Sequence, residues 1–164
     1  MPPVAPTRAH HRRARPGASW WYLGCLVTPL AEAAHTGGRL SAVEAVVPGG
    51  LSVPMHVHGR EDEAFFVTDG AIRITVGGEA VEASEGTFVW MPRAVPHGFE
   101  VLSRQATALI LCTPGGHLER MFAPFSEPAS ELVLPPPPAD PPMADILALD
   151  LELGVEYPGP PAGS

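Results

Sequence analysis

The sequence is poor in charge and contains no lysine. All ten of its basic residues are Arg, and charged residues make up only 17% of the 164 positions. The 18 acidic residues leave a net charge of −8, which argues against non-specific binding to nucleic acids, because the phosphate backbone would repel the protein. No apolar run approaches the ~18 residues that a membrane-spanning helix needs. We therefore expect neither a nucleic acid nor a membrane as a partner.

Cysteine is scarce as well. Cys25 and Cys112 stand in separate apolar runs without repeated spacing, so they form no disulfide framework and are expected to be buried free thiols. This cysteine usage indicates a cytoplasmic protein. The sequence also lacks a Gly-x-Ser-x-Gly elbow, a phosphate-binding glycine loop and a Cys-x-x-Cys pair, which removes three common kinds of catalytic site.

Turn-forming residues, by contrast, are abundant: the 21 Pro and 17 Gly favour short strands over long helices. Alternating apolar runs separated by turn residues fill the chain between residues 20 and 113, and Gly77-Gly78 has the form of a tight hairpin turn. Nine such runs with no helix between them predict an all-β sandwich or barrel. The runs cover residues 20–28, 39–47, 54–58, 63–68, 71–76, 79–83, 87–91, 97–102 and 105–113.

A helical period appears only after residue 114, where an apolar face predicts a helix packed outside the barrel. A second short helix is expected over residues 143–153, capped by Asp140 and ended by Gly154. The face of the first helix consists of Leu118, Met121, Phe122 and Phe125.

Three segments follow from these patterns. Residues 1–18 hold four Arg and no acid, and we interpret them as a disordered basic tail. A signal peptide is the alternative, but the apolar stretch that follows contains Pro29 and alternates like a strand. Residues 19–126 are expected to form the barrel, and residues 127–164 a Pro-rich C-terminal extension with the short helix.

Three of the seven histidines carry the functional prediction. His56 and His58 are two positions apart in a predicted strand, so their side chains project from the same face. Both could reach one ion at about 2.0–2.2 Å from an imidazole nitrogen. Two neighbouring imidazoles on an apolar wall are costly unless something binds them. His97, from a separate hairpin that begins at Gly86, is the next candidate ligand.

A carboxylate is expected beside these histidines. Glu63 lies five residues after His58, so in one unbroken strand it would face the opposite side. We expect Gly59-Arg60 to break the strand, after which Glu63 points inward. Glu61-Asp62 would then lie at the turn, in solvent.

The spacing of these residues resembles a known family. The pattern Gly50-(x5)-His56-x-His58-(x4)-Glu63-(x6)-Gly70 is similar to the first motif of the cupins. The pattern Gly86-(x5)-Pro92-x-Ala94-(x2)-His97-(x3)-Glu100 is similar to the second, with two departures. Ala94 replaces a usual Gly, so a different turn conformation is expected there, and Glu100 replaces an Asn that is not normally a ligand.

The resemblance implies a single cupin barrel, a double-stranded β-helix or jelly-roll, with one divalent transition metal ion per chain. The ion would be Fe, Mn, Ni, Co or Zn, held by His56, His58, Glu63 and His97. It also implies a homodimer, as is common among small cupins. Residues 61–67, 92–97 and 113–116 further resemble small bacterial proteins of the quercetin 2,3-dioxygenase-like group.

Three functions remain open. The first is a dioxygenase that uses O2 on an aromatic, flavonol-like or polyketide-like enolisable substrate, with Glu63 as the catalytic base. The second is a non-redox isomerase, cyclase or dehydratase in which the metal is only a Lewis acid. The third is a small-molecule-binding or sensor cupin without catalysis.

Apolar side chains are expected to line the substrate pocket, and core filling is the alternative for each of them. Phe65 and Val67 lie two and four residues after Glu63, and Phe99 lies two residues after His97, so each is expected to face the same side as that ligand. The further candidates are Met55, Trp90, Ile110 and Cys112, and the pattern does not show which side of the sheet these four side chains face. Such walls favour an aromatic or polyketide-like small molecule over a sugar.

The remaining polar residues of the barrel are interpreted as surface groups. His35 and His117 lie near Gly-Gly turns and are expected to be exposed. Arg39 and Arg73 could bind a substrate carboxylate, but a solvated strand face is the simpler interpretation.

Overall fold

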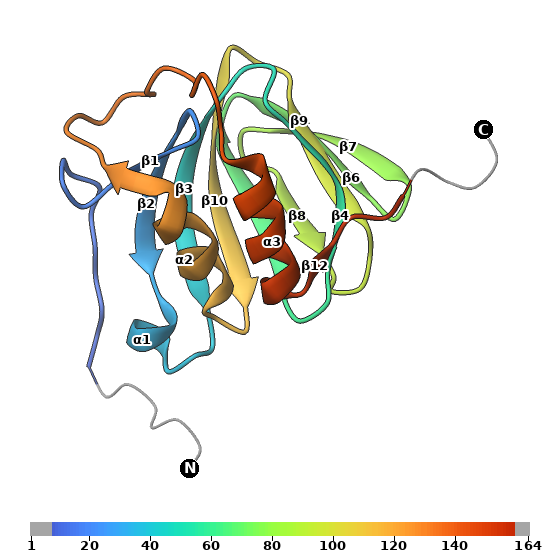
Figure 1. The fold of residues 1–164 in the computed structure, drawn as a ribbon, viewed down its shortest axis with the longest axis horizontal. Helices are drawn as coiled ribbons and strands as arrows, with labels where there is room; N and C mark the ends of the chain where they lie inside the picture. The colour runs from blue at the N-terminus through green and yellow to red at the C-terminus, as the bar shows by residue number, and fades with distance from the viewer. Residues whose placement is uncertain (1–7, 160–164) are drawn as a thin grey trace.

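Two antiparallel β-sheets pack face to face in the computed structural model, which describes residues 8–159 (Figure 1). One sheet has seven strands in the order β11-β1-β2-β3-β10-β5-β8, and the other has five in the order β12-β4-β9-β6-β7. The prediction of an all-β jelly-roll is therefore confirmed. The strands are β1 (Trp20–Tyr22), β2 (Cys25–Ala31), β3 (Ser41–Pro48), β4 (Ser52–His58), β5 (Asp62–Asp69), β6 (Ala71–Val76), β7 (Glu79–Ser84), β8 (Phe88–Met91), β9 (His97–Val101), β10 (Gln105–Thr113), β11 (Ser126–Pro128) and β12 (Val155–Glu156).

The core lies between the sheets and follows the two-residue period of the strands. In β10, alternate residues from Ala106 to Cys112 are buried, and this strand pairs with β3 on one side and β5 on the other. The inner face of the opposite sheet supplies Ile72 and Ile74 of β6. Burial of these apolar side chains stabilises the fold, at roughly 25 cal/mol per Å² of apolar surface removed from water.

Two hairpin turns show how local sequence shapes the sheets. Gly77 and Gly78 both have positive φ and join β6 to β7, as predicted. The single strand expected over residues 20–28 is wrong, because Leu23 and Gly24, with φ of 47° and 87°, turn the chain back and separate β1 from β2. An apolar Leu in a left-handed conformation is uncommon, so the pattern did not mark this turn.

The helices are short and lie outside the sheets. They are α1 (Ala33–Thr36), α2 (His117–Phe122), the 3-10 helix η1 (Ala123–Phe125) and α3 (Met143–Leu153). The predicted helices after residue 114 and over residues 143–153 are both confirmed, and Gly154 ends α3 with φ of 83°. Asp140 does not cap α3: Pro142 occupies the N-cap, and no side chain caps the helix.

Both flanking segments contact the barrel. In the tail expected to be disordered, residues 1–7 lie outside the described part, but the ring of His10 stacks on His35 and the guanidinium of Arg12 donates to the carbonyl of Pro29. The C-terminal extension adds β11 to one sheet and β12 to the other. Strand addition of this kind uses backbone hydrogen bonds, which a side-chain pattern does not reveal.

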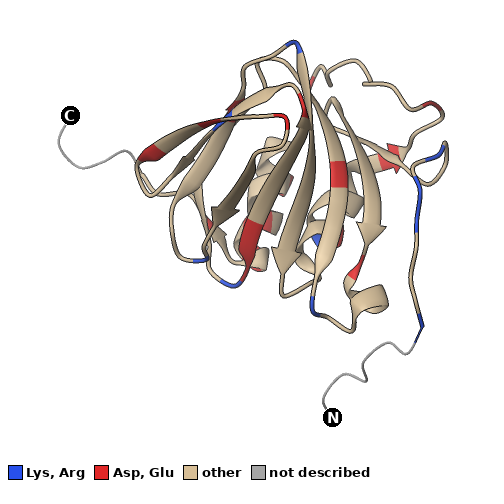
Figure 2. Cartoon of the chain, turned by 180° about the vertical axis from the view of Figure 1, so that it is seen from behind, with Lys and Arg blue, Asp and Glu red and all other residues tan. Residues whose placement is uncertain are grey.

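None of the helices in the described part of the chain is long and apolar enough to span a membrane. In Figure 2, several Arg residues lie along the N-terminal segment, and acidic and Arg residues are interspersed over the strands and loops of the sheets. Arg73 is an example: on the outside of its sheet it pairs with Glu82 at 2.9 Å and Glu100 at 3.3 Å.

Candidate metal centre

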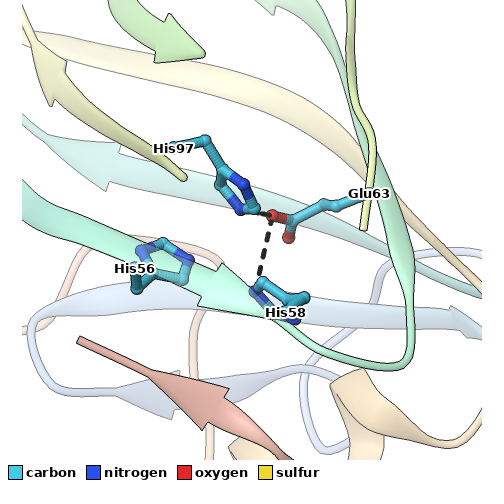
Figure 3. A group of neighbouring side chains, drawn as sticks. All are labelled: His56, His58, Glu63 and His97. Carbon is cyan, nitrogen blue, oxygen red and sulfur yellow. Dashed lines mark ion pairs between the residues drawn. The ribbon is translucent and has the colours of Figure 1, made fainter. Parts of the chain in front are cut away.

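Four polar side chains converge in the interior, from both sheets (Figure 3). His56 and His58 project from β4, His97 from the neighbouring β9, and Glu63 from β5 of the opposite sheet. One potential ligand atom from each residue lies within 4.8 Å of all the others, and all four side chains are buried. The four residues singled out in the sequence are thus brought together.

Breaks in the strands aim these side chains. β4 ends at His58 and β5 begins at Asp62, so the expected break at Gly59-Arg60 is confirmed. Gly98, next to His97, allows β9 to approach β4 closely: a Cβ at this position would lie 2.8 Å from the carbonyl oxygen of Val53. The absence of a side chain at residue 98 therefore helps to bring His97 against the other two histidines.

The turn before His97 has an unusual backbone. Ala94 has φ of 63°, a left-handed conformation that favours glycine, although the residue carries a Cβ. This conformation costs a residue with a Cβ about 1–2 kcal/mol. The backbone N–H of Ala94 donates to the carbonyl of His58 at 2.8 Å, which holds the turn against the end of β4.

Backbone carbonyls orient two of the imidazoles. Nδ1 of His56 lies 2.8 Å from the carbonyl oxygen of Pro54, and Nδ1 of His97 lies 3.0 Å from that of Val95. Because a carbonyl only accepts, each Nδ1 must carry the proton and donate. The Nε2 lone pair of each ring is then free for a cation, as in histidines that ligate metals.

The contacts within the cluster fit a cation. Nε2 of His97 lies 3.2 Å and Nε2 of His58 lies 3.9 Å from the same oxygen, Oε2 of Glu63 (Figure 3). His97 Nε2 is fully buried without a well-formed hydrogen bond. A neutral Nε2 lone pair and a carboxylate oxygen repel each other at such distances unless a proton or a cation lies between them. Three imidazoles and one carboxylate are a suitable donor set for Fe, Mn, Co, Ni or Zn.

Burial and charge shift the pKa values of these groups in opposite directions. Burial lowers the pKa of His58 to about 4 and also lowers the pKa of His56, so both rings are neutral at neutral pH and able to ligate. Burial alone would raise the pKa of Glu63, but the close contact with His97 and the other histidines outweighs it and holds this pKa below its ordinary value. Burial opposes the charged form of His97 too, yet the carboxylate of Glu63 raises its pKa.

A second group of buried polar side chains adjoins the first. Glu61 and His117 are only 9% and 3% exposed, so the expectation that both lie in solvent is wrong. Nδ1 of His117 lies 3.6 Å from Oε2 of Glu61, and Nδ1 of His58 lies 3.9 Å from that same oxygen. Asp62 alone turns outward, where it binds the guanidinium of Arg93 at 2.6 Å.

The packing of α2 explains the burial of His117. This residue is the first of α2, whose buried residues also include Leu118 and Phe122. Gly115, two residues before His117, runs so close to Leu40, the residue that precedes β3, that a Cβ would lie 2.6 Å from the carbonyl oxygen of Leu40. A histidine at the start of an apolar helix face was the only signal in the sequence, and the Gly-Gly turn before it suggested exposure instead.

The C-terminal extension contributes two further residues that the sequence did not single out. The hydroxyl of Tyr157 donates a 2.6 Å hydrogen bond to Oδ2 of Asp150, a carboxylate that is only 6% exposed. The Tyr157 ring centroid is 6.0 Å from that of His56. Asp150 belongs to α3, and Tyr157 directly follows β12, which pairs with β4 at His58.

Three of the proposed pocket residues are buried in the apolar interior. Phe65 and Val67 follow Glu63 on the inner face of β5, and Ile110 lies opposite Phe65 in the ladder of β10 and β5. Phe99 is partly buried and packs edge-on against Phe65, with ring centroids 5.3 Å apart. These side chains form an apolar wall on the same inner faces as the cluster.

The other two candidates face elsewhere. Trp90 is 47% exposed while its neighbours Val89 and Met91 are buried, so it points out of the sheet and is not a pocket wall. Met55 lines a hollow of about 210 Å³ over β4, β6 and β9. Phe99, Arg73 and Glu100 belong to the same lining, which includes none of the four cluster residues.

Residues 42–114 match the family described as "Cupin domain", a stretch that contains all four cluster residues but not His117, Asp150 or Tyr157. The chain is 26% identical over 111 residues to quercetin 2,3-dioxygenase of Bacillus subtilis (strain 168). The aligned stretch covers 68% of this chain and 33% of that protein. The chain thus spans only a third of that relative.

Solved structures show the same architecture. The structure of KdgF from a Halomonas species superposes with a TM-score of 0.52 at 25% identity, over 57% of this chain and 82% of that one. An RmlC-like cupin from Shewanella frigidimarina superposes with a TM-score of 0.50 at 22% identity, over 57% and 78% of the two chains.

Proposed function

This chain belongs to the cupin superfamily, and we propose on that basis that it is a metal-dependent enzyme acting on a small molecule, with His56, His58, Glu63 and His97 as ligands of one divalent ion. One observation carries the proposal: four buried ligand atoms from three strands meet within 4.8 Å of one another. The carbonyl contacts of His56 and His97, which reserve each Nε2 for a cation, support it further.

A divalent ion held there would supply a Lewis-acid centre, and a redox-active one would add chemistry with O2. The protein's own residues do the rest. Glu63 lies in the interior beside the apolar wall, where its carboxylate can accept the proton of an enolisable substrate. Phe65 and Val67, which are buried in the apolar core, exclude water from this side of Glu63.

Dioxygenase chemistry on an aromatic, flavonol-like or polyketide-like substrate is the activity we favour. The similarity to quercetin 2,3-dioxygenase of Bacillus subtilis over 111 residues supports it, as does the apolar wall formed by Phe65, Val67 and Ile110. The stretch of similarity covers a third of that enzyme, so the substrate is a proposal about class and not about a compound.

A non-redox reaction is the second candidate, because three imidazoles and a carboxylate hold Zn2+ as well as a redox-active ion. With a Lewis acid and Glu63 as base, the same site would catalyse isomerisation, cyclisation or loss of water.

Measurements with an oxygen electrode distinguish the dioxygenase reaction from the non-redox reaction. We expect protein loaded with Fe2+, Mn2+, Co2+ or Ni2+ to consume O2 together with a flavonol such as quercetin, and the Glu63→Gln variant to lose this activity. The matched control is Trp90→Ala, which alters only the outer face and should keep it. Turnover without O2 uptake would favour the non-redox reaction. If quercetin binds but no product forms with any of the metals, a sensor function is supported instead. If the wild-type protein retains no metal at His56, His58, Glu63 and His97, the proposal is overturned.

A further inference from the structure

We propose that His58, Glu61 and His117 form a second divalent-cation site, which the imidazole of His58 bridges to the first. The three residues come from the end of β4, the connection to β5 and the first turn of α2. One ligand atom from each lies within 4.8 Å of the other two, and all three side chains are buried. The inference rests on the proposed function only through His58, which both sites share.

The distances are those of ligands around an ion. Oε2 of Glu61 lies 3.6 Å from Nδ1 of His117 and 3.9 Å from Nδ1 of His58. Both distances exceed the ~3.2 Å limit of an ordinary N–H···O hydrogen bond. Atoms bonded to one ion at about 2.0–2.2 Å, by contrast, lie roughly 3–4 Å apart. The same spacing recurs in the first cluster, where His58 Nε2 and Glu63 Oε2 are 3.9 Å apart.

The polar atoms at this point have no other partner. Nδ1 of His58, Oε2 of Glu61 and both ring nitrogens of His117 are buried without a hydrogen bond within the described part of the chain. Folded proteins leave few buried polar atoms unsatisfied, and three of them within 4.8 Å of one another call for a bound species. A divalent cation such as Zn2+ satisfies the carboxylate oxygen of Glu61, Nδ1 of His58 and one ring nitrogen of His117 together, because the second nitrogen of the His117 ring points in another direction.

Charge balance also favours two ions. The interior holds the carboxylates of Glu61, Glu63 and Asp150, all buried. None of them is in the ion pairs that the described arginines form, which go to Glu32, Asp62, Glu82 and Glu100. When a second ion binds Nδ1 of His58, the proton on that nitrogen leaves to solvent and the ring becomes an imidazolate. Two divalent ions then balance three carboxylates and one imidazolate.

Zinc stoichiometry of full-length variants tests the proposal. Titration with Zn2+ by calorimetry, followed by desalting and elemental analysis, should give two ions per chain for the wild type. His117→Ala should lose one ion and keep the first site, His97→Ala should lose one and keep the second, and His58→Ala should lose both. His35→Ala is the control and should retain two. His117→Gln, which preserves more of the buried volume, repeats the test if His117→Ala fails to fold, and circular dichroism checks each variant.

The outcomes separate this proposal from the proposed function. One ion in the wild type that His97→Ala loses and His117→Ala keeps would overturn the second site alone. In that case Glu61 and His117 only position His58 for the first ion. One ion that His117→Ala loses and His97→Ala keeps would overturn the first site and leave the second standing. Retention of no ion by the wild type would overturn both.

Electron paramagnetic resonance with Cu2+ tests the bridge itself. An imidazolate shared by two Cu2+ ions couples their spins, so the signal of the first equivalent should fall severalfold when the second equivalent is added. In His117→Ala the signal of one ion should persist. A wild-type signal that instead doubles with the second equivalent would show two uncoupled ions and overturn the bridging role of His58.

Discussion

His56 lies directly opposite His97 in the ladder of β4 and β9, with the centroids of the two rings 4.5 Å apart. Backbone hydrogen bonds between the strands therefore set the distance between two of the four proposed ligands. A site built on paired strands is positioned more precisely than one built on loops. We therefore expect small changes in the separation of β4 and β9 to change the affinity for the metal.

Gly98→Ala tests this dependence on strand approach. The new Cβ would lie 2.8 Å from the carbonyl oxygen of Val53, so β9 must move away from β4 or strain the backbone. We expect the free energy of unfolding to fall by about 1–3 kcal/mol, as in other overpacked sites, and the affinity for Zn2+ to fall as well. Urea denaturation and calorimetry measure the two effects. Gly159→Ala is the control, because its Cβ meets no atom within 4 Å; equal behaviour of the two variants would contradict the prediction.

The metal-free protein should lose stability as the pH falls from about 6.5 to about 4. Burial lowers the pKa of His58 to about 4, from about 6.5 in the unfolded chain, so the unfolded state binds more protons in this range. The contribution of His58 to stability is present above pH 6.5 and decreases on acidification, by about 3 kcal/mol in total. The lowered pKa values of His56 and His117 act in the same direction, and the raised pKa of His97 opposes them.

Urea denaturation of protein treated with a chelator, at pH 7 and at pH 4.5, measures this loss. His58→Gln removes the titrating ring and should show a weaker pH dependence than the wild type. Stability that increases on acidification would contradict the assignment of a neutral, buried His58.

Tyr157→Phe should destabilise the protein at neutral pH. The hydroxyl of Tyr157 donates a 2.6 Å hydrogen bond to the buried carboxylate of Asp150, and removing it leaves that oxygen unsatisfied. Hydrogen bonds to charged groups contribute about 1.5–3 kcal/mol, and we expect a loss of this size. A double-mutant cycle with Asp150→Asn measures the coupling directly. Additive effects of the two substitutions would show that the hydrogen bond contributes little in solution.

Phe65 and Trp90 should respond differently to truncation, although both were candidates for the pocket wall. Phe65 lies in the core, so Phe65→Ala should cost about 3–5 kcal/mol of the free energy of unfolding. Trp90 is largely exposed, and Trp90→Ala should change the stability by less than about 1 kcal/mol. Thermal or chemical denaturation compares the two; a large loss for Trp90→Ala would mean that this face is covered in solution.

Much of the fold and of the first cluster could be predicted from local sequence. Alternation with a period of two identified the faces of the longer strands, and the His56-x-His58 spacing placed two imidazoles on one side of β4. The strand break after His58 explains why Glu63 faces inward, although an unbroken strand would place it on the opposite side from His58. Turn residues such as Gly77-Gly78 located a hairpin. The orientation of Trp90 could not be predicted in this way, because all four residues of β8 are apolar and no polar residue marks the face of the strand that points to solvent.

Which side chains share a strand face, and which turns separate the strands, therefore follow from the sequence alone, because both depend on backbone geometry over a few residues. Three relationships become visible only in the folded chain: His117 meets Glu61 and His58, Tyr157 binds Asp150, and β11 and β12 extend the two sheets. These contacts join segments far apart in the chain through packing and backbone pairing, and no local periodicity records which distant segments will come together.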